Sequence, residues 1–269
     1  MNQPTPCTAP EDDRRFATTL ARGLTVLRAF RSSDDGLGNG EIAERTGLPK
    51  STVSRLTWTL HQLGYLTHSG RADRYRPGPA LLALGNVAAA SISFVEMAGP
   101  IMQRLADDTG TLALLLVRDQ GKLLIVKTWR PQGVSSLWLE AGHRVPVMKS
   151  SSGRALLAAQ TDEAFERTML LAGADPAEAR EARRDAWSQL LGRGYVIHDP
   201  AQYFAPSIHA VARPFQSPDL SEPVIFTCGA MPADLSIERM RDAVGPALDA
   251  GVKDLERNMG QTAGSLFLE

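Results

Sequence analysis

Two short amphipathic segments separated by a tight turn lie between residues 41 and 63, and they constrain the fold more than any other feature of the sequence. Residues 41–46 predict a first helix, residues 47–49 the turn, and residues 50–63 a second helix that Gly64 ends. The apolar residues of the second helix recur at helical intervals, so they predict one stripe that packs on the first helix. These residues are Val53, Leu56, Leu60 and Leu63. The pattern is typical of a helix-turn-helix.

The opposite face of the second helix carries small hydroxyl groups and one arginine near its beginning. At about 100° per residue, Ser51, Ser54 and Arg55 lie away from the apolar stripe. Hydroxyls can approach base edges and phosphates, Arg can pair with guanine, and a helix N-terminus favours a phosphate. We therefore expect this helix to enter the major groove of DNA. Its candidate DNA-binding residues are Lys50, Ser51, Thr52, Ser54 and Arg55.

A basic hairpin is predicted directly after this helix. Residues 65–68 and 74–76 alternate as two strands do, and residues 69–73 predict the turn between them. Arg71, Arg74 and Arg76 fall where a wing meets the DNA backbone or the minor groove, and they complete the candidate DNA-binding set. Residues 50–79 carry a net charge of +4, which adds sequence-independent affinity that salt weakens. The segment predicts a winged helix-turn-helix with double-stranded DNA as its partner.

Length and charge favour two domains with different partners. The chain has 269 residues, enough for two domains. Residues 1–79 contain 11 Lys or Arg and 8 Asp or Glu, whereas residues 80–269 contain 18 and 22. A basic N-terminal part followed by an acidic remainder indicates that the N-terminal part binds nucleic acid and the remainder binds something else.

The remaining composition excludes several classes of protein. The two cysteines, Cys7 and Cys228, form no disulfide framework and no CxxC metal motif, so we expect neither a metal nor another cofactor. The N-terminus does not resemble a signal peptide, and the longest apolar run, residues 112–117, is too short to cross a membrane. We expect a cytoplasmic protein.

The order of the segments predicts the domain boundaries. We expect a disordered tail at residues 1–13, a winged helix-turn-helix domain at 14–79, a linker helix at 80–93 and a second domain at 94–269. The first helix of the DNA-binding domain is predicted from an apolar stripe of Phe16, Leu20, Leu24, Leu27 and Phe30. The Gly-rich residues 32–40 predict a loop, since their spacing does not match a dinucleotide motif and no strand precedes them. The linker is rich in Ala and Leu, so it requires burial, for which a partner chain is one means.

The second domain alternates hairpin-like strand pairs with helices, which predicts an α+β fold around a mostly antiparallel sheet. The expected strands are 111–118, 122–129, 134–139, 195–198, 208–215 and 223–230. The expected helices are 95–108, 151–159, 162–171, 177–191 and a last helix near 240–259, kinked at Gly245 and Pro246.

Several motifs together resemble the IclR family of bacterial transcription regulators. In the first domain they are Gly47-Leu48-Pro49-Lys50-Ser51-Thr52-Val53-Ser54-Arg55-Leu56, Leu63-Gly64-Tyr65-Leu66 and residues 75–85. In the second they are residues 142–147, Ser152-Gly153-Arg154-Ala155-Leu156-Leu157-Ala158, Gly194-Tyr195 and Ala210-Val211-Ala212-Arg213-Pro214-Phe215. The resemblance implies a winged helix-turn-helix, a linker helix and a GAF-like effector-binding domain. It also implies homodimers or homotetramers on palindromic operators, controlled by a small metabolite that is often an organic acid.

The second domain offers two candidate anion-binding features. Ser150, Ser151, Ser152 and Gly153 precede a helix and predict either an anion site or ordinary capping by Ser151 or Ser152. Arg213 shares a strand face with Val211 and Phe215, so it is either a clamp for a ligand carboxylate or the partner of Asp199 or another acid. Further candidate effector-binding residues are Met148, Tyr203, His209 and Thr227, and expected cavity walls are Leu114, Leu116, Met148, Phe215 and Phe226.

Two other functions fit the sequence less well than a DNA-binding regulator does. A hydrolase is disfavoured because the sequence contains neither a G-x-S-x-G elbow nor an H-E-x-x-H motif. A dimeric sensor that acts through protein partners is disfavoured by the basic residues of the second helix and the wing.

Overall fold

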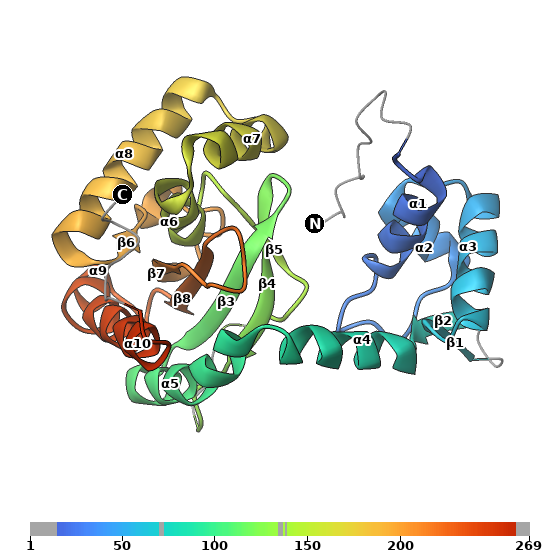
Figure 1. Ribbon diagram of the computed structural model, residues 1–269, viewed down its shortest axis with the longest axis horizontal. Coiled ribbons are helices and arrows are strands. Elements are labelled where there is room, and N and C mark those ends of the chain that lie inside the picture. Colours follow the sequence, from blue (N-terminus) through green and yellow to red (C-terminus); the bar gives the residue numbers. More distant parts are fainter. Residues whose placement is uncertain (1–14, 70–72, 134–136, 138, 262–269) are drawn as a thin grey trace. The chain divides into compact units, whose positions relative to one another are not determined.

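The computed structural model describes residues 15–69, 73–133, 137 and 139–261 (Figure 1). The chain divides into two compact units, Met1–Ser91 and Ile92–Glu269. The predicted tail at residues 1–13, Cys7, Arg71 and most of the strand predicted at 134–139 lie outside the described residues. Within those described ranges, no single helix is long and apolar enough to cross a membrane, and only the bent pair formed by residues 79–90 and 93–109 meets that test of length and composition together.

The N-terminal unit is a winged helix-turn-helix followed by one further helix. Its elements are α1 (Thr18–Leu27), α2 (Asn39–Thr46), α3 (Lys50–Gln62), β1 (Leu66–Ser69), β2 (Arg74–Pro77) and α4 (Pro79–Ala90). Gly47 closes α2 in the left-handed conformation, φ +71°, which glycine adopts without strain. β1 and β2 are antiparallel, and a bridge between Leu37 and Tyr75 adds the predicted loop to the hairpin.

The core of this unit is smaller than the apolar stripes predict. It consists of Val26, Ala29, Leu37, Ile42, Ala43 and Val53. The predicted first helix is confirmed as α1, but its apolar stripe is not a core stripe, because Leu20 and Leu24 are 63% and 51% exposed. Instead α1 packs through Gly23, whose position lies close to Leu56 of α3, and through Val26. Leu63 is also exposed, since it lies just beyond the end of α3.

Thr57 takes a core position that the apolar pattern did not reveal. Its hydroxyl is fully buried and makes hydrogen bonds to Asn39 Oδ1 at 2.9 Å and to the carbonyl of Val53 at 3.0 Å. The Asn39 contact joins the beginning of α2 to the middle of α3, so it sets how the second helix of the motif lies on the first.

The second unit is an antiparallel sheet with helices on both faces, and its fold class is confirmed. The strands are β3 (Leu112–Asp119), β4 (Lys122–Trp129), β5 (Arg144–Pro146), β6 (Val196–Ile197), β7 (His209–Phe215) and β8 (Val224–Ala230), in the order β5-β4-β3-β8-β7-β6. The helices are α5 (Ser93–Thr109), α6 (Ser151–Ala159), α7 (Asp162–Ala172), α8 (Pro176–Arg193), η1 (Pro200–Gln202), α9 (Ile237–Arg239), the π-helical turn η2 (Met240–Val244) and α10 (Gly245–Asn258). β5 was not predicted, since it has only three residues.

Helices cover both faces of the sheet (Figure 1), and a separate hydrophobic core lies on each face. On one face α5 and α10 pack on Leu115, Val211, Phe215 and Phe226. On the other face α6 and α8 pack on Leu114, Leu116, Ala212 and Ile225. Because both faces are covered, the central strands β7 and β8 are buried almost throughout.

Candidate functional site

The outward face of α3 is the first candidate site. Lys50, Ser51, Ser54 and Arg55 are exposed, and Thr52 is half-buried. Within the ranges that the structure describes, the Arg55 guanidinium has no hydrogen-bond or ion-pair partner. The N-cap of α3 is Pro49, which contributes no side-chain cap, so the N–H groups of the first turn stay available to a phosphate. The structure therefore places the predicted recognition residues together on one open surface.

The wing arginines are less free than the sequence suggests. Arg74 donates to the carbonyl of Gly36 at 2.8 Å and to Glu41 Oε1 at 3.1 Å, so it attaches the hairpin to the loop before α2. Arg76 forms an exposed ion pair with Asp35. An exposed pair of this kind contributes at most about 1 kcal/mol and can exchange for a phosphate. Arg71 lies outside the described residues.

A partly buried ion pair connects the helix-turn-helix to the end of α1. Arg45 donates to both carboxylate oxygens of Asp34, at 2.6 and 2.9 Å, and to the carbonyl of Ala29 at 2.9 Å. Burial by itself would raise the pKa of Asp34, but hydrogen bonds from Arg45 and from the N–H of Arg31 outweigh it and hold that pKa below its usual value. This network fixes the loop on which the wing rests.

The serines before α6 are mainly structural. Ser150 is the N-cap, accepting from the N–H of Gly153 at 3.0 Å, and its hydroxyl donates to the carbonyl of Pro146 at 2.6 Å. Ser151 donates to the carbonyl of Ala210 at 2.7 Å and accepts from the backbone N–H of His198 at 2.9 Å. Capping is therefore confirmed, although by Ser150 rather than by Ser151 or Ser152. No described histidine ring is bonded to these hydroxyls.

Gly153 allows the backbone before α6 to approach the helix. A Cβ atom at this position would lie 1.9 Å from the carbonyl oxygen of Val147. No other residue fits there without moving the chain, so the close approach holds the serine turn against the sheet.

Ser152 faces a small cavity between the sheet and the segment before β7. Its hydroxyl is 2.9 Å from that of Thr227 on β8, and Tyr203 lies on the same wall. The free volume is about 10 Å³, which is room for about one water molecule. Apart from these hydroxyl-bearing residues, the cavity is apolar or backbone-lined, by Leu114, Leu116, Leu137, Leu139, Val145, Phe204, Ile208, Ala210 and Gly229. Burial raises the pKa of Tyr203 far above its usual value, so its hydroxyl stays protonated.

The ligand-clamp interpretation of Arg213 is wrong. Its side chain is 1% exposed and points to the α10 face, where Nε is 2.8 Å from Asp249 Oδ1 and a terminal nitrogen is 2.9 Å from Glu256 Oε1. A second terminal nitrogen lies 3.3 Å from Glu256 Oε2, so the pairing with Glu256 is bidentate. Arg213 is therefore an ion-pair residue, with partners other than the Asp199 that the sequence suggested.

Four further residues expected at the cavity lie elsewhere. His209 shares the face of Arg213, and its ring is bonded to the carbonyl of Leu235 at 2.6 Å. Met148 packs with Val147, Leu157 and Phe165 in a cluster under α7. The predicted walls Phe215 and Phe226 belong to the α5–α10 core, whereas Leu114 and Leu116 do line the cavity.

Comparisons with known proteins identify the family. The model of the IclR helix-turn-helix domain matches residues 19–70, and that of the bacterial transcriptional regulator IclR C-terminal domain matches residues 87–179. A crystal structure of an IclR family transcriptional regulator from Brucella abortus is 31% identical, with 94% of this chain and 96% of that chain covered and a TM-score of 0.71. This chain belongs to the IclR family.

Two other IclR relatives extend the comparison. The HTH-type transcriptional regulator TsaQ1/TsaQ2 of Comamonas testosteroni is 28% identical over 261 residues, covering 95% of this chain and 93% of that protein. An IclR homologue from Microbacterium hydrocarbonoxydans, crystallised with 4-hydroxybenzoate, shares the fold with a TM-score of 0.68 at 22% identity, covering 89% of this chain and 99% of that chain. The IclR assignment makes the first unit a helix-turn-helix DNA-binding domain and the second an effector domain. The matched relatives are regulators of transcription rather than enzymes.

Proposed function

We propose that this IclR-family chain is a ligand-responsive regulator that binds an inverted-repeat operator through α3 and senses a small organic acid in the Ser152–Thr227 cavity. The observation that carries the DNA-binding part is the exposed Arg55, which has no partner among the described residues and lies beside Ser51 and Ser54 on the open face of α3. Arg bonds guanine with two parallel hydrogen bonds, and the neighbouring hydroxyls suit base edges or phosphates. Since its target is chromosomal DNA, we place the protein in the cytoplasm.

Assembly into a homodimer is supported by apolar surface in the N-terminal unit. None of the residues of α4 is buried, and Leu82, Leu84 and Val87 are more than half exposed. On α1, Leu20 and Leu24 are exposed as well. Burying one such side chain contributes about 1.5–3 kcal/mol, so together they favour association. A two-fold dimer presents two copies of α3, which in this geometry bind half-sites about one helical turn apart, roughly 34 Å.

Selection of DNA fragments from a random library, followed by footprinting, tests operator binding and symmetry. We expect an inverted repeat and an affinity that falls steeply with salt. Sedimentation at micromolar concentration tests assembly: Val87→Glu should dissociate the dimer, whereas Leu170→Glu, an exposed residue on α7, should not. A monomer that protects a single half-site would contradict the proposal.

An organic acid with an apolar body fits the cavity on three grounds. The hydroxyls of Ser152 and Thr227 are bonded to each other and can rotate to donate to a carboxylate instead. Ser152 also belongs to the first turn of α6, where the helix dipole favours negative charge. The remaining lining is mostly aliphatic, and none of the described lining residues is charged. The Microbacterium hydrocarbonoxydans relative was crystallised with an acid of this kind, 4-hydroxybenzoate. Because the free volume is about 10 Å³, the wall must move to admit any such ligand.

Calorimetry with a panel of aromatic and aliphatic acids tests the effector part. Hydrogen bonds to a charged group contribute about 1.5–3 kcal/mol, so Ser152→Ala or Thr227→Val should lower the affinity about tenfold or more. Ser188→Ala, an exposed serine on α8, is the matched control. Equal affinity of all four proteins would contradict this assignment of the cavity.

A further inference from the structure

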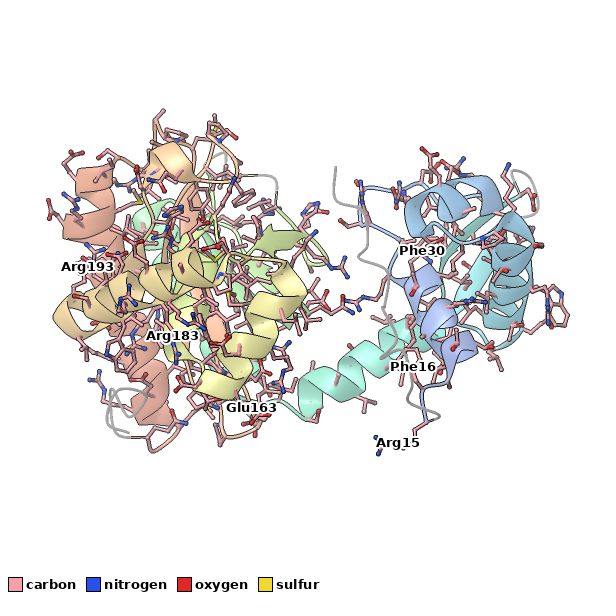
Figure 2. All side chains as sticks on the ribbon, turned by 90° about the horizontal axis from the view of Figure 1, so that it is seen from above. Arg15, Phe16, Phe30, Glu163, Arg183 and Arg193 are labelled. Atoms are coloured by element: carbon pink, nitrogen blue, oxygen red, sulfur yellow. The ribbon has the colours of Figure 1, made fainter. Side chains whose placement is uncertain are left out.

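A second, more polar groove lies in the effector domain, separate from the Ser152–Thr227 cavity. Its volume is about 470 Å³, and residues of α6, α8, the segment 197–202, α9 and η2 border it. Three guanidinium groups line it, those of Arg154, Arg193 and Arg241. Arg193 lies at the C-terminal end of α8 (Figure 2). The function proposed above uses none of these residues.

The three arginines are poorly compensated by the protein. Among the described residues, the buried Nε atom of Arg154 has no hydrogen-bond partner, and the carboxylate oxygen Oδ2 of Asp185 is 3.7 Å from its Nη1. Within the same part of the chain, Arg193 donates to neutral acceptors, the carbonyl of Tyr195 at 3.2 Å and the side-chain oxygen of Gln189. Its guanidinium also lies over the Tyr195 ring, 5.0 Å from the ring centre. The exposed guanidinium of Arg241 has no partner among the described residues.

The charges in the groove leave an excess of positive charge. The groove also contains two carboxylates. Asp185 is half exposed and accepts a hydrogen bond from Gln189, and Asp199 caps the turn that follows it. His198 adds no charge near neutral pH, because burial and the charge of Arg154 lower its pKa to about 4. Burial and the charge of Arg241 also lower the pKa of Arg193. An anion in the groove would relieve this repulsion.

We propose that this groove is a second ligand site, which binds a small dianion of the phosphate monoester class. Guanidinium groups match phosphate oxygens with paired hydrogen bonds, and three of them converge here from separate elements. The volume lies within the range of small-molecule sites and exceeds that of a bare phosphate, so an organic part fits beside the phosphate.

The groove shares one segment with the effector cavity. His198, Asp199 and Gln202 line the groove, while Tyr203 and Phe204, directly after them, line the cavity. The rings of His198 and Tyr203 are 6.1 Å apart, and the N–H of His198 donates to Ser151 beside Ser152. A dianion that orders residues 198–202 therefore also orders the cavity wall, and the two ligands affect each other's affinity. This coupling rests on the proposed function, whereas binding of the dianion does not.

Calorimetry on the full chain tests the site, with glycerol phosphate and inorganic phosphate as probes and sodium chloride holding the ionic strength constant. Arg241→Gln, which removes an exposed side chain and spares the fold, should lower the affinity for glycerol phosphate at least tenfold, and Arg154→Gln should do the same. Arg184→Gln, an exposed arginine of α8 outside the groove, should leave it unchanged. If inorganic phosphate binds as tightly as the ester, the result supports the site and identifies free phosphate as its ligand.

Three outcomes would overturn the proposal: no binding of either probe at millimolar concentration, equal affinity of Arg241→Gln and wild type, or tighter binding of succinate than of both phosphates. Hydrogen exchange supplies a readout that needs neither operator nor effector. Glycerol phosphate should slow exchange of the amides of residues 198–204 in wild type and not in Arg241→Gln. This exchange measurement does not depend on DNA binding. A failure of the proposed regulator function can therefore be distinguished from a failure of the phosphate site.

Discussion

Replacement of Arg213 by methionine separates its structural role from a role in ligand binding. The change keeps an apolar chain but removes the guanidinium that joins the carboxylates of Asp249 and Glu256. Both carboxylates are largely buried, and the guanidinium that joins them is 1% exposed. Asp249 keeps its ion pair with Lys253, but the shared guanidinium is lost from both carboxylates. Removing one partner of a buried pair costs about 3–5 kcal/mol, because a buried charge loses its counter-charge. For a domain of this size that is a fall in melting temperature of roughly 6–20 °C.

Differential scanning calorimetry of the full chain is the appropriate assay, since the two domains can unfold in separate transitions. Only the transition of the effector domain should shift. Arg257→Met is the matched control: it breaks an exposed pair with Asp254 on the same helix, and such a pair contributes at most about 1 kcal/mol. A second substitution, Glu256→Leu, should restore part of the loss in Arg213→Met. If Arg213→Met melts at the same temperature as the control, Arg213 does not have the structural role described. Loss of effector affinity at unchanged stability would indicate that Arg213 binds the ligand instead.

Substitutions at His198, Gly153 and Arg74 test three other features of the structure. Burial lowers the pKa of His198 to about 4, so the folded state resists protonation of its ring. The effector domain should therefore lose up to about 3 kcal/mol of unfolding free energy as the pH falls from 6.5 to 4. Unfolding experiments on His198→Gln should show a weaker pH dependence, and an unchanged pH dependence would be evidence against this role of His198. Gly153→Ala should destabilise the same domain by about 1–3 kcal/mol, because its Cβ would meet the Val147 carbonyl, and a melting temperature equal to wild type would show that the turn can move. Arg74→Ala should lower the stability of the DNA-binding domain by about 1 kcal/mol through its lost bonds to Gly36 and Glu41, measurable by urea unfolding, whereas Arg104→Ala on α5 should not.

Local periodicity in the sequence was enough to place most elements of both domains. The helix-turn-helix, the hairpin and the sequence of helices and strands in the second domain follow from apolar spacing and from glycines at helix ends. What periodicity could not decide was which apolar stripe is a core. Leu20 and Leu24 recur at helical intervals, but they face outward in the single chain. Periodicity alone does not distinguish a core stripe from an exposed apolar surface.

The candidate site was predicted less well, and the central strands explain why. Alternation correctly placed Arg213 on one face with Val211 and Phe215. Both faces of β7 and β8 are buried, however. Without a polar face, the sequence does not indicate which side chains of these strands point toward α6. The contact between Ser152 and Thr227 joins residues 75 positions apart, and the arginine groove joins α6, α8 and η2. Such contacts depend on tertiary packing that a single sequence does not display.

Fluorescence anisotropy of labelled DNA measures whether α3 reads DNA sequence. Wild type and Arg55→Ala are titrated against the selected operator and against a scrambled duplex at fixed salt, with Arg104→Ala as control. Arg55→Ala should lose about 1–3 kcal/mol of operator binding, so the ratio of operator to scrambled affinity should fall roughly tenfold or more, while scrambled binding changes little. An unchanged ratio for Arg55→Ala would contradict the assignment of α3 as the recognition helix.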